Sequence, residues 1–248
     1  MASAASGERR LSPPRTTAPS RLRGADPPSA TRPPCARCRT APAPTPCSTA
    51  SATPWPSAPG PVPPPRLARA AARHADAEAG LRAEYDHCAA ARTVGHDLPC
   101  AAAVVAVHVP GGLLSVAWSG DARACLLLDG HLRLLTEDHN ARRVYDDGDR
   151  NLITSCLGEA RSDEETERLW GHPAIEYLRC PTRPGRLLLA SDGAYEPHED
   201  AGRDLAAYLT GDPRTAAERL VDDAVRRARA LPDPYADNAT ALIARITC

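Results

Sequence analysis

The sequence predicts an α+β fold in which antiparallel strands precede helices and one last strand closes the domain. Three observations support this class. Two pairs of apolar runs are each separated by a short turn signal, a helix with a recognisable N-terminal cap follows them, and an apolar run lies near the end. Because successive strands are joined by tight turns and not by helical crossovers, the sheets should be antiparallel and not doubly wound.

Residues 1–66 should not form a folded unit. Seventeen of the 26 prolines lie within residues 1–65, where bulky apolar residues are few. Such a segment cannot bury enough apolar surface to offset the entropy lost on ordering. Its net charge is +7, whereas that of residues 67–248 is −8. We expect a disordered Pro/Ala/Arg-rich segment that is an interaction arm, a passive tail, or the product of a mis-assigned start or shifted frame.

The sequence pattern of residues 67–92 predicts one amphipathic helix. Apolar side chains recur at spacings of three and four from Leu67 to Cys88, and charged residues fall largely on the other side. This pattern is typical of packing against a core and requires no further function.

The strands begin after Pro99. A Pro-Gly-Gly turn joins the predicted strands Ala101–Val109 and Leu113–Trp118 into a hairpin. An Asp-Gly turn joins Ala124–Leu128 to His131–Leu135 in a second hairpin.

The remaining elements are a strand, a helix and a strand. Arg186–Ala190 is a short apolar strand that leads into a Ser-Asp-Gly sequence. Asp212 and Pro213 form the N-terminal cap and first turn of a helix. The last strand is expected over Ala239–Ile246.

Hydropathy, cysteine content and charge exclude several classes of protein. The longest apolar run, Ala101–Val107, has seven residues, short of the about 20 that a membrane-spanning helix needs. The nine cysteines are odd in number and irregular in spacing, which favours free thiols in a reducing cytoplasm. The basic arm lacks Lys and interleaved aromatic residues, so we expect no nucleic-acid partner and no membrane association.

Three aspartates stand at strand ends. Asp121 follows the first hairpin, Asp192 follows the strand over 186–190, and Asp237 precedes the last strand. Carboxylates that gather beside such turns form an oxygen site suited to Mg²⁺ or Mn²⁺, and two such ions can activate a water molecule for attack on phosphorus. Each Asp by itself is also an ordinary turn former or helix cap.

Six short segments follow one another along the chain: Val104–Val107, Ser119–Arg123, Leu135–His139, Leu157-Gly158, Leu188–Gly193 and Asp237–Thr240. In this order they resemble the motifs of the type 2C (PPM) metal-dependent serine/threonine protein phosphatases. The resemblance covers roughly residues 67–247. It implies an αββα sandwich of two antiparallel sheets flanked by helices, with an Mg²⁺ or Mn²⁺ centre at one end and a phosphorylated protein as substrate.

The resemblance assigns roles known in the family to particular residues of this chain. The resemblance implies that Asp192 and Asp237 are metal ligands, with Gly193 and Asn238 beside them in the same motifs. It implies that Asp121 is the acid associated with a third, more weakly held ion.

Other matched residues are expected to have structural roles. Arg123 should tie its turn by a salt bridge, and Asp138 and His139 belong to a motif that we interpret as structural. Three histidines match no motif and are expected on the surface: His131, His172 and His198.

The opening motif of the family has no counterpart in this chain. That motif holds a phosphate-binding Arg and an Asp-Gly-Met-Gly-Gly sequence whose Asp bridges two metals, but Asp26, which precedes every other Asp here, matches nothing. Without the bridge, the distance between two ions is not fixed, and missing first strands should leave sheet edges open. The acids of the predicted helix, which are Asp76, Glu78, Glu84 and Asp86, are not expected to substitute.

Residues 67–248 are therefore expected to form an N-terminally incomplete phosphatase domain with weak or no activity. Three hypotheses stay open at this point. The chain is a metal-dependent phosphatase, a non-catalytic relative that binds a phosphoprotein or another partner, or a mis-started or frame-shifted version of an active enzyme. The coding DNA upstream of codon 70, translated in all three frames, separates the last from the others.

Overall fold

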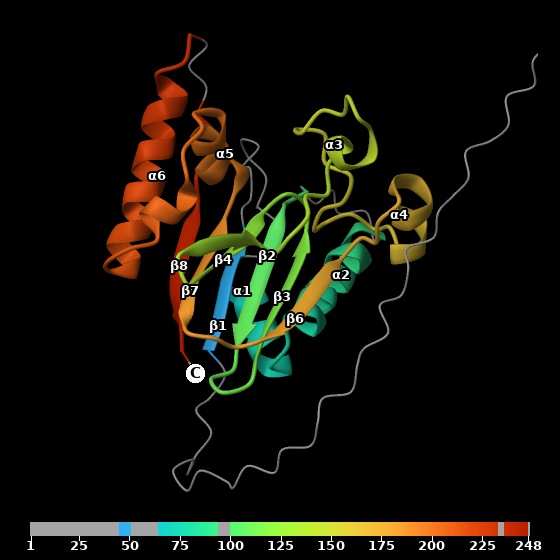
Figure 1. Ribbon diagram of the computed structural model, residues 1–248. Coiled ribbons are helices and arrows are strands. Elements are labelled where there is room, and N and C mark those ends of the chain that lie inside the picture. Colours follow the sequence, from blue (N-terminus) through green and yellow to red (C-terminus); the bar gives the residue numbers. More distant parts are fainter. Residues whose placement is uncertain (1–44, 51–63, 94–99, 233–235, 248) are drawn as a thin grey trace, which may run out of the picture. The chain divides into compact units, whose positions relative to one another are not determined.

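The computed structural model describes residues 45–50, 64–93, 100–232 and 236–247 (Figure 1). No helix in these ranges is long and apolar enough to cross a membrane. The strands described are β1 (Thr45–Ala50), β2 (Ala103–His108), β3 (Leu113–Ser119), β4 (Arg123–Leu128), β5 (His131–Leu134), β6 (Glu176–Pro181), β7 (Gly185–Ala190) and β8 (Ala241–Ile246). The helices described are α1 (Pro64–His74), α2 (Ala77–Thr93), α3 (Ala141–Val144), α4 (Asp163–Trp170), α5 (Asp192–Asp200), α6 (Pro213–Arg229) and the 3₁₀ helix η1 (Leu205–Tyr208).

Two antiparallel sheets form the centre of the described part of the chain. Their strand orders are β1-β2-β3-β6 and β5-β4-β7-β8. Side chains alternate across each strand, so every second residue points to the opposite sheet. This inner layer is apolar and includes Val104, Val116, Ala124, Leu187 and Leu189.

Helices cover the two outer faces of this sandwich (Figure 1). On the first sheet, Leu67 of α1 and Leu81 of α2 pack against Val105 of β2. On the second sheet, residues of α5 and α6, among them Leu220, pack against Leu188 of β7. The four layers are the αββα sandwich that the motif resemblance implies, and the predicted α+β class is confirmed.

Strand β1 lies within the segment for which the sequence predicts no regular structure. Its main chain pairs with β2 in an antiparallel register that runs from Thr45 opposite His108 to Ala50 opposite Ala103. It therefore covers an edge of β2 that we expected to be open. The rest of residues 1–66, apart from the start of α1 at Pro64, lies outside the described residues.

The prediction of one helix over residues 67–92 is wrong. Ala75 has a φ of 49°, in the left-handed region, and ends the first helix. The carboxylate of Asp76 then accepts a hydrogen bond of 3.0 Å from the Ala79 N–H and caps the start of α2. The two helices cross closely, because a Cβ atom placed on Gly80 would lie 2.3 Å from the Cα atom of Ala71.

Replacing Gly80 with Ala should lower the free energy of unfolding by about 2 kcal/mol, although Ala is the better helix former by about 1 kcal/mol. The added methyl group would overlap the main chain of α1 and force the two helices apart. Urea unfolding measures the change. Ala83→Ser, at an exposed position of the same helix, should change stability by less than about 0.5 kcal/mol. A Gly80→Ala protein as stable as the wild type would contradict the close crossing.

Candidate functional site

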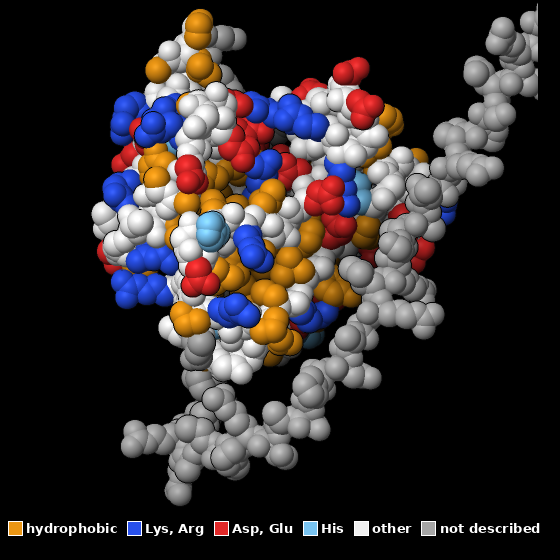
Figure 2. Space-filling view, in the orientation of Figure 1, with side chains coloured by type: hydrophobic (Ala, Val, Ile, Leu, Met, Phe, Trp, Pro, Cys, Tyr) orange, Lys and Arg blue, Asp and Glu red, His pale blue; other side chains and the backbone are white. Residues whose placement is uncertain are grey.

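A cavity of about 630 Å³ opens at one end of the second sheet. Its walls come from α5, from the C-terminal end of α6, from the segment before β8 and from the loop after α3. Acidic side chains gather in the hollow between these elements, with Arg side chains beside them (Figure 2). The charged residues that line it are Arg150, Asp192, Glu196, Asp200, Arg227 and Asp237.

Asp192 and Asp237 lie side by side because Ser191 joins the chain segments that carry them. The Ser191 hydroxyl donates to the carbonyl oxygen of Asn238 (3.1 Å) and accepts from the Thr240 N–H (3.0 Å). The close approach also needs Gly193, since a Cβ atom there would lie 2.9 Å from the Asn238 oxygen. The sequence-predicted pair of aspartates therefore meets at one wall of the cavity.

No ion pair with a described residue neutralises the negative charges of these two carboxylates. Burial raises the pKa of Asp192, and the charge of Asp237 raises it further. Among the described residues, neither carboxylate forms an ion pair with an Arg or a His. A pair of this kind favours a bound cation.

Asp121 lies at the tight turn between β3 and β4. Gly120 has a φ of 101° there, and a Cβ atom on it would lie 2.7 Å from Ala102, so the turn requires glycine. Asp121 is 6% exposed, and its carbonyl oxygen accepts a hydrogen bond from the Tyr195 hydroxyl (3.0 Å). Burial and the nearby charge of Asp192 raise the pKa of Asp121 to about 7.

Arg123 ties this turn to two other segments. Its guanidinium binds both carboxylate oxygens of Asp138 (2.9 and 2.8 Å) and reaches Glu199 on α5 (2.6 Å). It also lies 3.9 Å from the centre of the Tyr195 ring, in a cation–π contact. The residue thus forms the salt bridge that the sequence suggested, and Asp138 is its partner.

His139 also bonds to the main chain of this turn. Its main-chain N–H donates to the Gly120 carbonyl (3.0 Å), and its Nδ1 atom accepts from the Gly120 N–H (3.3 Å). Its Nε2–H then donates to Glu176 (2.9 Å), which also binds Arg143. These bonds hold the histidine in one tautomer and away from the cavity.

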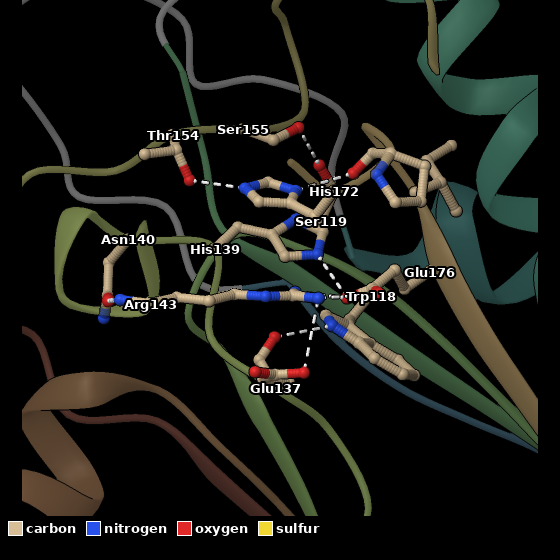
Figure 3. A network of polar contacts seen from close by, with 12 residues as sticks. Trp118, Ser119, Glu137, His139, Asn140, Arg143, Thr154, Ser155, His172 and Glu176 are labelled. Atoms are coloured by element: carbon tan, nitrogen blue, oxygen red, sulfur yellow. Dashed lines mark hydrogen bonds and ion pairs between the residues drawn. The ribbon is translucent and has the colours of Figure 1, made fainter. Parts of the chain in front are cut away.

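The expectation that His172 and His198 are surface residues is wrong, whereas His131 is exposed as expected. His172 is 1% exposed and stacks on His139 with ring centres 4.3 Å apart (Figure 3). Its Nε2 atom accepts from the Thr154 hydroxyl (2.8 Å). His198 is buried on α5 and bonds to the Leu220 carbonyl. Tertiary packing, which spacing in sequence does not reveal, decides both positions.

The acidic residues near α2 do not reach the cavity. Asp76 and Glu78 bind Arg179, and Glu84 binds Arg66. Asp86, like the others, is not among the residues that line the cavity. The helix therefore supplies no replacement for the missing bridging carboxylate.

The lining residues Glu196, Asp200 and Arg150 were not singled out from the sequence. Glu196 and Asp200 follow Asp192 at steps of four residues along α5, so they lie on one face of that helix. Arg150 enters from the loop after α3. The four-residue spacing would have revealed the two acids had a helix been predicted there, but no sequence signal places Arg150.

The donor set fits one hard cation and not two. In the described ranges, no group of three or more Asp, Glu, His or Cys side chains could hold a metal ion. Mg²⁺, however, is commonly bound by one or two carboxylates and several water molecules. Asp192 and Asp237 satisfy that requirement, whereas ligands for a second ion are not present among the described residues.

No protein-family model matches the chain, and no curated protein matches it. Solved structures do match. One is the serine/threonine phosphatase PstP/Ppp of Mycobacterium tuberculosis, which is 19% identical in sequence. The match spans 83% of this chain and 99% of the PstP/Ppp chain, with a TM-score of 0.56. The chain has the fold of the type 2C serine/threonine phosphatases.

Another type 2C fold is that of PppA, described as a key regulatory component of the T6SS in Pseudomonas aeruginosa. It is 22% identical over 68% of each chain, with a TM-score of 0.52. A structure of the PstP catalytic domain holds two manganese ions; that protein is 24% identical over 74% of this chain and 72% of its own, with a TM-score of 0.49. The likeness to PstP/Ppp and PppA, whose TM-scores exceed 0.5, establishes the fold of this chain and no more.

The buried His172 should make the protein less stable in mild acid. Burial lowers the pKa of His172 to about 4, while an unfolded histidine titrates near 6.5. Between these values the unfolded chain binds the proton and the folded chain does not, so the free energy of unfolding falls as pH drops from about 6.5 to about 4. We expect this residue to contribute about 3 kcal/mol to the fall.

Chemical unfolding at several pH values tests this. His172→Gln should flatten the slope between pH 6.5 and 4, even if it lowers stability throughout. His131→Gln, which replaces an exposed histidine on β5, should leave the slope unchanged. Equal slopes in the two variants would contradict the assignment.

Proposed function

We propose that this chain is a metal-dependent phosphatase domain that binds one divalent cation through Asp192 and Asp237 and acts weakly on phosphoserine or phosphothreonine in proteins. The observation that carries the proposal is the meeting of these two unpaired carboxylates at a cavity of a type 2C fold. The seryl or threonyl phosphate is proposed because solved proteins of this fold are named serine/threonine phosphatases. The odd cysteine count favours the cytoplasm.

Each residue has a part in this proposal. Asp192 and Asp237 hold Mg²⁺ or Mn²⁺, and the buried Asp121 adds a third negative charge close to Asp192. When bound, such a cation lowers the pKa of a coordinated water and makes it a nucleophile toward phosphorus. Gly193, Asn238 and Arg123 are supporting residues, because they set the positions of the three carboxylates.

A non-catalytic relative is the second candidate, and a specific observation favours it. Among the described residues, no group of three or more Asp, Glu, His or Cys side chains could hold a metal ion, so the ligands of a two-ion centre are missing there. Such a protein would bind a phosphorylated partner at the same cavity without hydrolysing it.

Cation binding separates this site from an ordinary acidic surface. Isothermal titration with Mn²⁺ should show one ion bound to the wild type and at least about a tenfold loss of affinity in Asp192→Asn and in Asp237→Asn. Asp222→Asn, at an exposed position of α6, is the matched control and should bind Mn²⁺ as the wild type does. The proposal fails if the wild type binds no Mn²⁺ or if all three variants behave alike.

Turnover distinguishes the phosphatase from the non-catalytic relative. With saturating Mn²⁺ and a phosphothreonine peptide, we expect phosphate release slower than about one turnover per second, the low end for ordinary enzymes, because the ligands of a second ion are missing from the described site. Phosphate release that is abolished in Asp192→Asn would identify the phosphatase. Mn²⁺ binding without any Asp192-dependent release would identify the non-catalytic relative. Turnover as fast as that of a typical enzyme, about ten per second or more, would contradict the expected impairment.

A further inference from the structure

Arg150 places a positive charge in the cavity wall opposite the acids of α5. Its Nη1 and Nη2 atoms lie 2.7 and 2.8 Å from the two carboxylate oxygens of Asp200, and its Nε atom lies 3.3 Å from Glu196. Arg227, the other Arg that lines the cavity, is bound to Asp223 on its own helix. Arg150 is therefore the Arg side chain in the cavity wall that links the loop after α3 to α5.

The ion pair of Arg150 is open to exchange. The Asp200 side chain is 51% exposed and that of Arg150 is 30% exposed. Ion pairs this exposed to water contribute little to stability, because water solvates both partners well when they separate. An incoming anion can consequently replace Asp200 at low cost.

The replacing anion should have the shape of a phosphate. A guanidinium fork that accepts two carboxylate oxygens accepts two phosphoryl oxygens with similar geometry. A phosphate monoester carries nearly two negative charges at neutral pH, compared with one on Asp200. It would thus compete well for Arg150 while its other oxygens face the cavity that holds Asp192 and Asp237.

Glu196 connects the two halves of this site. It lies one turn of α5 beyond Asp192. Burial raises the pKa of Glu196, and the charge of Arg150 opposes that effect while the charge of Asp192 adds to it. Arg150 is therefore within electrostatic reach of the helix face that carries the proposed metal ligand.

We propose that Arg150 binds the phosphoryl group of the substrate, with Asp200 as the partner that occupies the guanidinium when substrate is absent. This inference rests on the proposed function and assigns to Arg150 the phosphate recognition for which the sequence has no matching motif. Strand β1, with the sequence Thr-Pro-Cys-Ser-Thr-Ala, carries no Arg.

Phosphate binding measured by isothermal titration, with Mn²⁺ present and then absent, tests the proposal without depending on turnover. Arg150→Ala should weaken the binding of inorganic phosphate about tenfold or more. Arg150→Lys should fall between Ala and the wild type, because an ammonium group lacks the planar fork. Asp200→Asn should tighten binding a few-fold, because it removes a competing charge.

A matched control and a peptide complete the experiment. Arg214→Ala removes an exposed Arg of α6 that pairs with Glu218, and it should bind phosphate as the wild type does. A phosphothreonine peptide should show the same dependence on Arg150, whereas its unphosphorylated form should not bind. Thermal unfolding checks that each variant is folded.

The proposal is overturned if Arg150→Ala and Arg214→Ala bind phosphate equally well, if the wild type binds no phosphate, or if the two peptides bind alike. These failures are distinct from failure of the proposed function. If Asp192→Asn loses Mn²⁺ binding while Arg150→Ala binds phosphate as the wild type does, the proposed metal site is supported. The proposed role of Arg150 is then wrong. Phosphate binding that depends on Arg150, in a protein that binds no Mn²⁺, would instead retain the role of Arg150 and remove the proposed metal site.

Discussion

The hydroxyl group of Ser191 holds the candidate site together. It donates to the carbonyl of Asn238 and accepts from the N–H of Thr240, so the end of β7 is fixed against the segment that enters β8. Because the hydroxyl makes these long-range bonds, it does not cap α5, although Ser191 occupies the N-cap position. The helix lacks that local stabilising bond, and two carboxylates from segments 45 residues apart meet at one cavity as a result.

The turn that carries Asp121 is stabilised from outside, since its own carboxylate is unfavourable there. Burial near Asp192 raises the pKa of Asp121, which means that its charged form destabilises the fold at neutral pH. Arg123 ties the turn to Asp138, and His139 bonds to the Gly120 main chain; neither of these bonds involves the Asp121 carboxylate. The structural role of the segment Thr136–His139 is therefore to hold in place a turn that contains a buried acid.

The sequence predicted several elements whose signals are local, although it missed α4 despite its Ser162/Glu165 capping box. The turn at Asp129-Gly130 is an example, because both residues adopt positive φ as such a hairpin requires. The break at Ala75 was missed because alanine gives no turn signal and its conformation is imposed by packing. Helix α5 was missed because Pro197 lies inside it, and the site residues Glu196 and Asp200 were missed with it. Arg150 could not be predicted, since its position depends on where a loop meets a distant helix.

The absence of the family's opening motif, with its metal-bridging Asp, changes the balance of charge in the cavity. A two-metal centre offsets its carboxylates and the substrate phosphate with two dications, whereas the proposed site of Asp192 and Asp237 would hold one. A phosphate dianion that enters a cavity lined by α5 acids then meets net repulsion unless another cation faces it. In the proposed role, Arg150 provides that charge, and Asp200, which binds the guanidinium in this structure, neutralises it while substrate is absent. One ion and one guanidinium can thus bind a phosphate, but a guanidinium does not ionise water, so binding should be retained better than turnover.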